Sequence, residues 1–358
     1  MRRESLQSVT RLVVKLGTGI LTDSRKLPDL GRMEQLVQQV AAQCRAGREV
    51  VLVSSGAVGS GMGVLGFERR PTGLAELQAC AAVGQSRLMT TYARLFAQHD
   101  LSVAQVLLTH EDLRHHDRHL NARNTLVTLL DRHVVPIINE NDVVSFTELK
   151  FGDNDKLSAL VTCLLPADLL IILTTVDGVL ENFGKASPRR LSIVDTIDPA
   201  LETLSLGTAS ATAVGGMATK IQAARVTIRA GIPMVIASGA KKNVLARILD
   251  GEDEGTLFVP QPSRLKGRKR WIAFFHHPKG TLVVDDGAKT ALREKGKSLL
   301  PPGVARCEGR FAAGDVVSIC DLNGLEFARA ITEHDSDAIQ ARRLSRTEIV
   351  HRDNLVIL

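Results

Sequence analysis

The chain has 358 residues, 44% of them hydrophobic, which is enough to bury a substantial core and to form two domains. Aromatic residues make up only 3%, so the core must be aliphatic, as in α/β enzymes built on parallel strands. The formal net charge of +6 suits anionic substrates and gives only weak support for nucleic-acid binding.

No apolar run reaches about 18 residues, and no leader segment precedes the first predicted strand, so we expect no membrane segment. The cysteines are scattered and lack the spacing of metal ligands. They lie at Cys44, Cys80, Cys163, Cys307 and Cys320. Such residues are typical of reduced thiols in a cytoplasmic protein.

Strands and helices alternate through the first 250 residues. Arg11–Leu16 predicts a buried strand, and apolar residues at helical spacing from Leu30 to Cys44 predict a helix that ends at Gly47. The expected order continues with strand Val50–Val53, helix Leu74–His99, strand Val103–Leu108, a helix through Leu120–Leu130, strand Val134–Ile138, helix Asn154–Leu165, strand Leu169–Thr174, helix Met217–Ala230 and strand Pro233–Ala237. This repetition predicts an α/β fold in which a mostly parallel sheet is sandwiched by helices.

The pattern changes near residue 259. Prolines and a basic cluster at 264–270 predict a linker over residues 259–275, after a first domain at 1–258. Short strands dominate from 276 to 358 and predict a small β-rich domain, with strands at Thr281–Val284, Val316–Ile319, Glu326–Ile331 and Asn354–Leu358. Asn323-Gly324 lies between two of these strands and is a two-residue hairpin signal.

The first strand carries a lysine near its end and is followed by glycines. Lys15 precedes Leu16 and Gly17. A buried charge is costly without a partner, and glycine lets a backbone approach a ligand closely. This combination predicts a lysine directed at phosphate. The alternative is a lysine whose ammonium group reaches water from the strand end.

Small and polar residues follow several other strands. In an open α/β sheet, ligands bind at the carboxyl ends of the strands. The segments at these ends are Ser54-Ser55-Gly56-Ala57, Asn139-Glu140-Asn141-Asp142, Gly152-Asp153-Asn154-Asp155-Lys156, Thr174-Thr175 and Gly215-Gly216-Met217-Ala218-Thr219-Lys220. Each segment alone is consistent with a helix cap or a solvated turn. Their shared position predicts one site, although neither a P-loop nor a dinucleotide fingerprint is present.

Seven motifs occur in order along the chain. They are Val-Lys-Leu-Gly-Thr (14–18), Ser-Ser-Gly-Ala (54–57), Ala-Val-Gly-Gln-Ser-Arg-Leu (82–88), Leu-Asn-Ala-Arg-Asn-Thr (120–125), Asn-Glu-Asn-Asp (139–142), Gly-Asp-Asn-Asp-Lys-Leu-Ser-Ala (152–159) and Gly-Gly-Met-Ala-Thr-Lys (215–220). Together they resemble the glutamate 5-kinase family of the amino acid kinase superfamily, and residues 281–287 and 298–303 resemble a PUA domain. The resemblance covers nearly the whole chain. It implies ATP-dependent phosphorylation of the L-glutamate side-chain carboxylate, the first step of proline biosynthesis, with ATP and Mg²⁺.

The resemblance also implies roles for matching residues. Lys15, Lys220 and Asp155 are the expected catalytic residues, and Ser55, Asp142 and Asn154 the expected glutamate ligands. The expected ATP-binding residues are Lys15, Gly17, Thr174, Thr175, Val214, Gly215, Gly216, Met217, Ala218, Thr219 and Lys220. Backbone N–H groups near Gly17 and Gly56 are expected to meet phosphoryl oxygens, and Mg²⁺ to be held mainly by the ATP phosphates rather than by a protein metal site. Val214 and Thr175 depart from the threonine and aspartate usual in the family.

Alternative functions remain open. Within the same fold the substrate could be N-acetylglutamate, aspartate, carbamate or a nucleoside monophosphate, although motifs 139–142 and 152–155 with the C-terminal domain favour free glutamate. RNA binding is the alternative for the C-terminal domain, because PUA domains occur in RNA-modifying enzymes. Few aromatic residues interleave the basic cluster, which argues against RNA as the main partner. The family also implies a homo-oligomer, a dimer or tetramer, and possible hand-off of the product to glutamyl phosphate reductase.

Overall fold

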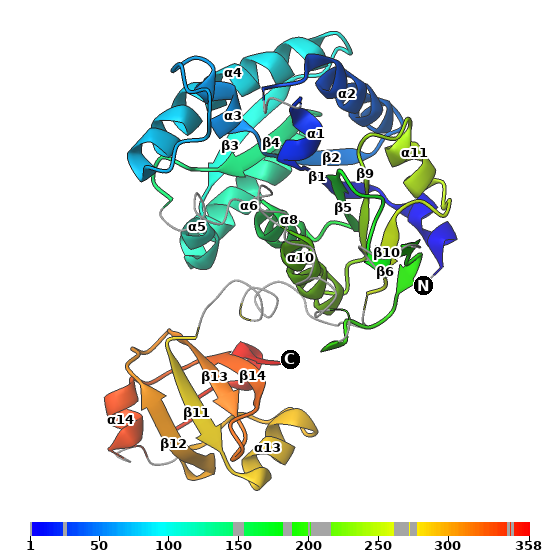
Figure 1. Cartoon of the computed structure of the whole chain (residues 1–358). Helices are drawn as coiled ribbons and strands as arrows, with labels where there is room; N and C mark the ends of the chain where they lie inside the picture. The colour runs from blue at the N-terminus through cyan, green and yellow to red at the C-terminus, as the bar shows by residue number, and fades with distance from the viewer. Residues whose placement is uncertain are drawn as a thin grey trace. The chain divides into compact units, whose positions relative to one another are not determined.

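The computed structural model describes residues 2–23, 27–145, 154–181, 188–199, 201, 216–260, 272, 278–341, 344 and 347–358. The chain divides into two compact units, Met1–Ser263 and Arg264–Leu358 (Figure 1). Most of the predicted linker at 259–275 lies outside the described residues. Within the described part of the chain, no helix combines the length and the apolar character that crossing a membrane requires.

The first unit is built on an eight-stranded sheet of order β3-β4-β2-β1-β5-β9-β10-β8. The strands are β1 (Arg11–Leu16), β2 (Glu49–Ser54), β3 (Val103–Leu108), β4 (Val135–Glu140), β5 (Leu169–Thr174), β8 (Ile193–Val194), β9 (Met234–Ser238) and β10 (Thr256–Phe258). β1 pairs in parallel with both β2 and β5, whereas β10 runs antiparallel to β9. The predicted mostly parallel sheet is therefore confirmed. A separate ribbon pairs β6 (Leu180–Glu181) with β7 (Arg189–Arg190).

Helices cover both faces of this sheet (Figure 1). They are η1 (Arg3–Ser8), α1 (Thr18–Leu21), α2 (Leu30–Arg45), α3 (Ala57–Met62), α4 (Leu74–Ala97), α5 (His110–Arg114), α6 (His116–Asp131), α8 (Asp155–Leu164), α10 (Met217–Arg229) and α11 (Val244–Leu249). The long predicted helices and strands agree with these elements to within a few residues. One core cluster joins α2, α4 and α11 to the central strands.

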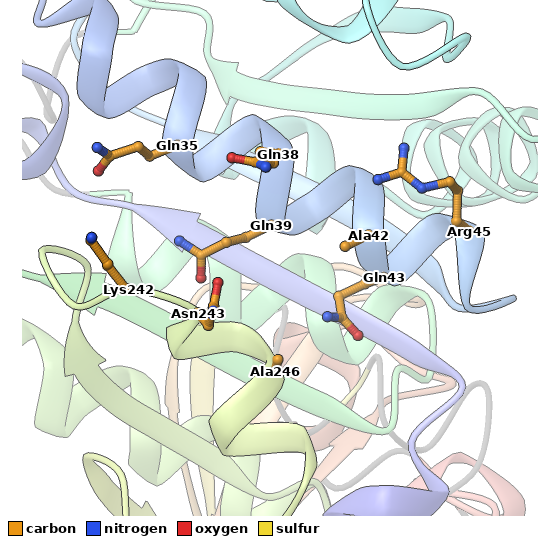
Figure 2. Close-up of a pocket in the computed structure, with 9 residues that line it drawn as sticks. All are labelled: Gln35, Gln38, Gln39, Ala42, Gln43, Arg45, Lys242, Asn243 and Ala246. Carbon is orange, nitrogen blue, oxygen red and sulfur yellow. The ribbon is translucent and has the colours of Figure 1, made fainter.

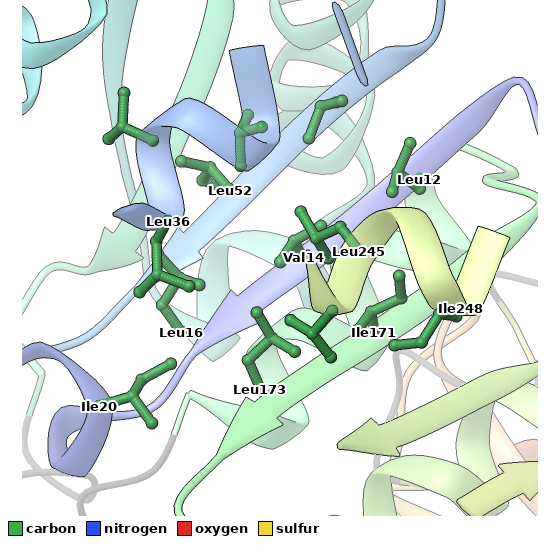
Figure 3. Packing of buried hydrophobic residues seen from close by; sticks show 14 of the residues in the cluster. Leu12, Val14, Leu16, Ile20, Leu36, Leu52, Ile171, Leu173, Leu245 and Ile248 are labelled. Carbon is green, nitrogen blue, oxygen red and sulfur yellow. The ribbon is translucent and has the colours of Figure 1, made fainter. Parts of the chain in front are cut away.

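The alternation of side chains along β1 decides which face Lys15 occupies. Leu12, Val14 and Leu16 belong to the core cluster shared with α2 and α11 (Figure 3). Successive side chains of a strand point to opposite faces of the sheet, so Lys15 must point away from that cluster. The opposite face carries α8, which contacts β1.

A polar groove of about 330 Å³ lies between α2 and α11. Glutamines of α2 line one side, and Lys242 and Asn243 lie on the other (Figure 2). Gln39 Oε1 accepts a hydrogen bond from the backbone N–H of Leu245. This groove therefore forms part of the attachment of α11 to α2, on the face of the sheet away from Lys15.

The second unit has a five-stranded sheet of order β12-β11-β13-β14-β15 and a core of its own. Its elements are β11 (Gly280–Val284), α13 (Asp286–Arg293), η2 (Pro301–Gly303), β12 (Val304–Gly309), β13 (Val316–Cys320), β14 (Glu326–Ile331), α14 (Ser336–Gln340), η3 (Arg352–Asn354) and β15 (Leu355–Ile357). The predicted small β-rich domain is confirmed, and β12 is a strand that the sequence reasoning did not predict.

The hairpin between β13 and β14 closes over three residues, not the two that were predicted. Asp321 N–H donates to the carbonyl of Leu325, and Gly324 N–H donates to the carbonyl of Asp321. Gly324 has φ +80°, whereas Asn323 is not among the residues with positive φ. A two-residue type I′ turn needs positive φ at both central positions. Here the Asp321 carboxylate accepts hydrogen bonds from the N–H groups of Asn323 and Leu325, which stabilises the longer loop.

Candidate active site

A buried ion pair joins the central strand to α8. Lys15 lies on β1, and its side chain is only 3% exposed. Its Nζ atom is 2.6 Å from Asp155 Oδ1. The partner that a buried charge requires is therefore present, and Lys15 does not extend to water.

A second lysine reaches the same carboxylate from α10. Lys220 Nζ lies 3.0 Å from Asp155 Oδ2, and the hydroxyl of Thr219 donates to the same oxygen over 2.9 Å. Asp155 is fully buried as the first residue of α8, where the helix dipole favours a negative charge. Lys220 is the fourth residue of α10, near the helix N-terminus, where the helix dipole disfavours a positive charge. The negative charge of Asp155 offsets this unfavourable interaction.

These three residues, which we call the charged trio, carry one surplus positive charge. Charges removed from water are stable only when they are paired and hydrogen-bonded. Both carboxylate oxygens of Asp155 already face ammonium groups, so Asp155 is arranged to hold the lysines rather than to accept a proton. Two ammonium groups held together in this way suit an anionic group at the carboxyl ends of the central strands.

A chain of side-chain amides lies beside the charged trio. Asn154 caps α8, and its Nδ2 atom donates to the carbonyl of Ser54 over 2.6 Å and to Asn139 Oδ1 over 2.7 Å. Asn139, near the end of β4, donates from Nδ2 to Gln85 Oε1 on α4 over 2.8 Å. Ser55 Oγ lies 3.4 Å from Asn154 Nδ2. The predicted residues Ser55 and Asn154 are thus brought together.

Sequence reasoning did not single out Gln85 or Asn139 as site residues. Gln85 occurs in a quoted motif, and its position offered a further signal. The buried residues of α4 recur at helical spacing through Leu77, Cys80, Ala81 and Gly84. Gln85 is a polar side chain in that apolar stripe, and a buried polar group requires a partner. Which residue is that partner depends on the packing of α4 against β4.

Close helix packing holds the turn that carries Ser55. Gly56 has φ +100°, a conformation that lets the chain turn sharply from β2 into α3. A Cβ atom on Gly84 would lie 1.7 Å from the carbonyl oxygen of Ala57. The backbone of α4 therefore rests directly on the first turn of α3, and only glycine allows this approach.

Asp142 lies in the turn after β4 and is partly buried. Partial burial lowers the pKa of Arg70, while the negative charge of Asp142 opposes that shift. Arg70 therefore lies within electrostatic range of the carboxylate that was predicted to bind substrate. Its proximity to Asp142 was not predicted from the sequence.

The predicted nucleotide residues lie along the ends of β1 and β5 and at the start of α10. Gly17 donates its N–H to the carbonyl of Leu173, which joins the two strand ends. This N–H is engaged in pairing the two strand ends, and the expectation that backbone N–H groups near Gly17 meet phosphoryl oxygens stays a prediction. Thr174 ends β5 and Thr175 is exposed beside it.

The loop before α10 is only partly described. Gly216 caps α10, and Met217, Ala218, Thr219 and Lys220 open it. Val214 and Gly215 lie outside the described residues. Among the residues that the structure describes, no group of three or more His, Cys, Asp or Glu side chains could hold a metal ion.

Comparison with known protein families matches both units of the chain. A model described as the amino acid kinase family matches residues 10–238, and a PUA domain model matches residues 280–352. Among curated proteins, a glutamate 5-kinase from Geobacter sp. (strain M21) is 45% identical over 100% of both chains. A glutamate 5-kinase from Moorella thermoacetica is 46% identical over 99% of this chain and 98% of its own.

Solved structures show the same fold at lower identity. Carbamate kinase from Giardia lamblia bound to AMP-PNP is 21% identical, with a TM-score of 0.50 over 71% of this chain and 100% of its own. UMP kinase from Bacillus anthracis is 17% identical, with a TM-score of 0.50 over 72% of this chain and 99% of its own. The fold is shared with these kinases, while the full-length similarity is to glutamate 5-kinases. The chain therefore belongs to the glutamate 5-kinase family, in which an amino acid kinase domain is joined to a PUA domain.

Proposed function

We propose that the chain transfers the γ-phosphoryl group of ATP to the side-chain carboxylate of L-glutamate, forming L-glutamyl 5-phosphate for proline biosynthesis. The observation that carries this proposal is the charged trio Lys15–Asp155–Lys220, buried beside the amide of Asn154. Full-length similarity to glutamate 5-kinases supports the choice of substrate.

The chemistry requires alignment and charge neutralisation rather than proton removal. A glutamate carboxylate is already ionised at neutral pH and needs no general base. The difficulty is that two anions must approach in line, so catalysis depends on positioning and on fixed positive charge. Lys15 and Lys220 supply that charge, and Asp155 holds both ammonium groups in place.

We assign the glutamate ligands by the same reasoning. Ser55 and Asn154 bind the amino acid, and Asp142 pairs with its α-ammonium group. Support comes from the contact between Ser55 and Asn154 and from the position of Asp142 in the turn that follows β4. An acidic side chain is a suitable partner for an ammonium group, and a hydrogen bond to a charged group contributes about 1.5–3 kcal/mol.

ATP is proposed to bind along Gly17, Thr174, Thr175 and the loop Val214–Lys220. The N-terminus of α10 supports this assignment, because the N–H groups of a first helical turn and the helix dipole favour phosphate. Mg²⁺ is proposed to arrive with the phosphates, as Mg²⁺ commonly does, and to share in neutralising their charge. Asp155 is committed to the lysines, so we assign it no role as a metal ligand.

A substrate panel tests the proposed activity. The full chain is incubated with ATP, Mg²⁺ and one acceptor, and any acyl phosphate is trapped with hydroxylamine. We expect hydroxamate from L-glutamate and not from N-acetylglutamate or aspartate. Turnover with another acceptor would keep the role of the charged trio and overturn the glutamate assignment of Asp142 and Asn154. Absence of turnover with every acceptor would overturn the proposed function.

The remaining assignments are proposals that family membership supports. We propose a kinase domain at 1–258, a connection at 259–275 and a PUA domain at 276–358, supported by the matches at 10–238 and 280–352. A cytoplasmic homo-oligomer, a dimer or tetramer, is proposed, and light scattering on the full chain would test its assembly. Because an acyl phosphate hydrolyses readily, direct hand-off to glutamyl phosphate reductase is also proposed.

A further inference from the structure

The side chains of Asn154, Asn139 and Gln85 form a hydrogen-bonded series beside the charged trio, which we call the amide chain. The orientation of each amide, oxygen versus nitrogen, is fixed by its neighbours. Asn139 accepts the backbone N–H of Glu140 through a side-chain atom 2.9 Å away, and an N–H can only donate, so that atom must be Oδ1. Asn154 is oriented independently, because it faces the carbonyl of Ser54, which can only accept. The remaining nitrogen of Asn139 must then face an acceptor.

That acceptor is Gln85 Oε1, which leaves the nitrogen of Gln85 directed elsewhere. Gln85 is 8% exposed. Within the described part of the chain, its buried Nε2 atom has no hydrogen-bond partner. A buried amide without a partner costs about 1–3 kcal/mol. Exchanging the oxygen and nitrogen of the Gln85 amide would place Gln85 Nε2 against Asn139 Nδ2, and both atoms are donors. The orientation of Gln85 is therefore fixed, and Nε2 is the atom without a partner among the described residues.

We propose that Gln85 is a further substrate-binding residue, whose Nε2 donates a hydrogen bond to the α-carboxylate of the bound amino acid. The inference rests on the proposed function and adds a recognition element to it. Only an acceptor can satisfy this nitrogen, and a carboxylate is a strong one.

Two further observations favour the α-carboxylate over the reacting carboxylate. Gln85 lies two hydrogen bonds beyond Asn154, which directly precedes the Asp155 that holds both lysines. The reacting carboxylate belongs beside those lysines. Asp142, the proposed partner of the α-ammonium group, lies three residues after Asn139. The α-carboxylate and the α-ammonium group share one carbon atom, so their partners are expected to lie close together.

Two substitutions separate substrate binding from a purely structural role. Gln85→Glu keeps an oxygen acceptor for Asn139 but replaces the donor with an acceptor, while Gln85→Met removes both. The test compares L-glutamate with L-isoglutamine, whose α-carboxylate is replaced by an amide and whose reacting carboxylate is unchanged. Hydroxamate formation gives kcat and KM for each acceptor, with competition between the two where turnover is slow.

We expect either substitution to raise KM for L-glutamate by about 10- to 100-fold, the range for losing a hydrogen bond to a charged group. The wild-type preference for L-glutamate over L-isoglutamine should fall by at least about tenfold. The fall should be larger in Gln85→Glu, because an α-amide can donate to the new carboxylate. An unchanged preference in both variants would overturn the proposal and leave Gln85 only its contact with Asn139.

Controls keep this outcome distinct from other failures. Gln98→Met replaces an exposed glutamine at the end of the same helix and should leave both acceptors unaffected. Thermal unfolding shows whether Gln85→Glu and Gln85→Met are folded. If one of them is not, the preference for L-glutamate over L-isoglutamine is measured on the other. A wild-type enzyme that forms no hydroxamate from L-glutamate would contradict the proposed function itself, before Gln85 is tested.

Discussion

At the scale of single residues, the charged trio behaves as one unit. Removing the ammonium group of Lys15 or Lys220 leaves Asp155 with one ammonium partner and takes away positive charge from the reacting group. We expect Lys15→Met and Lys220→Met each to lower kcat by about 10²-fold or more, the scale seen when one fixed donor is lost. Lys242→Met, in the groove away from Lys15, is the matched control. Turnover near that of the control in either variant would contradict the mechanism.

Removing the carboxylate tests whether Asp155 stabilises the folded protein as well. Asp155→Asn removes the carboxylate that both buried ammonium groups contact, and breaking a buried pair in this way costs about 3–5 kcal/mol. The double variant Asp155→Asn with Lys220→Met also removes one of the two ammonium groups that contacted the carboxylate. We therefore expect urea unfolding to show the double variant to be no less stable than Asp155→Asn alone. Additive losses in the double variant would mean that the two residues are not coupled.

The sequence predicts that Lys15 needs a charged partner, but it does not predict the hydrogen bonds of the amide chain. A lysine inside an apolar strand requires a partner, and Asp155 follows from a motif of the resembled family. The pairing of Gln85 with Asn139 depends on how a helix face meets a strand 54 positions away. No local pattern specifies that contact, so Asn139 was interpreted only as part of a polar segment.

At the scale of elements, long helices and buried strands were predictable because their apolar residues recur at the expected spacing. β12 was missed because its residues are mostly exposed and give no apolar run. The loop between β13 and β14 was predicted from Asn323-Gly324 alone. Hydrogen bonds from the backbone to Asp321 decided its length, and that acid lies outside the two-residue signal.

Packing of α3 against α4 gives a prediction about Gly84. A Cβ atom there would lie 1.7 Å from the oxygen of Ala57 and 2.5 Å from the nitrogen of Gly61, both backbone atoms. The helices must separate, and overpacking of this kind costs about 1–3 kcal/mol or more. We expect Gly84→Ala to lower the free energy of unfolding and to reduce activity through the turn at Ser55.

The control is Gly31→Ala on α2, where the new Cβ would meet, among the residues that the structure describes, only Asp29 Oδ1 at 3.6 Å. Alanine is the better helix former, so this variant should be at least as stable as the wild type. Denaturant unfolding measures both variants. Equal stability of Gly84→Ala and the wild type would show that α3 and α4 are not held at this distance.

Asp168 connects the start of β5 to the start of β1, because its carboxylate accepts hydrogen bonds from Thr10 and from the N–H of Arg11. These bonds make the stability of the fold depend on pH. Partial burial alone would raise its pKa, but hydrogen bonds from the N–H of Arg11 and from Thr10 bring the pKa below its ordinary value. A carboxylate with a lowered folded-state pKa stabilises the fold above the unfolded pKa of about 3.9. This contribution is lost as pH falls through the folded-state pKa.

We therefore expect Asp168→Asn to be less stable than the wild type at pH 7, by less than about 1 kcal/mol because Asp168 is exposed and solvent screens its interactions, with a smaller difference in acid. Urea unfolding at pH 7 and at successively lower pH measures the gap. Asp131→Asn, at the exposed end of α6, serves as a control for the loss of a surface charge. A gap that is constant or grows towards acid would contradict the assignment.

At the scale of the whole molecule, the change in sequence pattern near residue 259 indicates two domains. Each unit has its own core, with Ile171 in the first and Ile319 in the second, both fully buried. The sequence could not identify the partner of each core residue, because those contacts join distant segments. It could indicate two separate cores, since the α/β alternation gives way to short strands.

Separate cores predict separate unfolding. Chains with two domains commonly depart from a single two-state transition. Truncation of a buried isoleucine to alanine costs about 2–5 kcal/mol. In calorimetry we expect Ile171→Ala to lower one transition and Ile319→Ala to lower the other, while added ATP raises only the transition that Ile171→Ala lowers. One common transition that moves in both variants would show that the two units unfold as a single cooperative body. If ATP raised only the transition that Ile319→Ala lowers, ATP would bind the second unit, and the proposed nucleotide site would be contradicted.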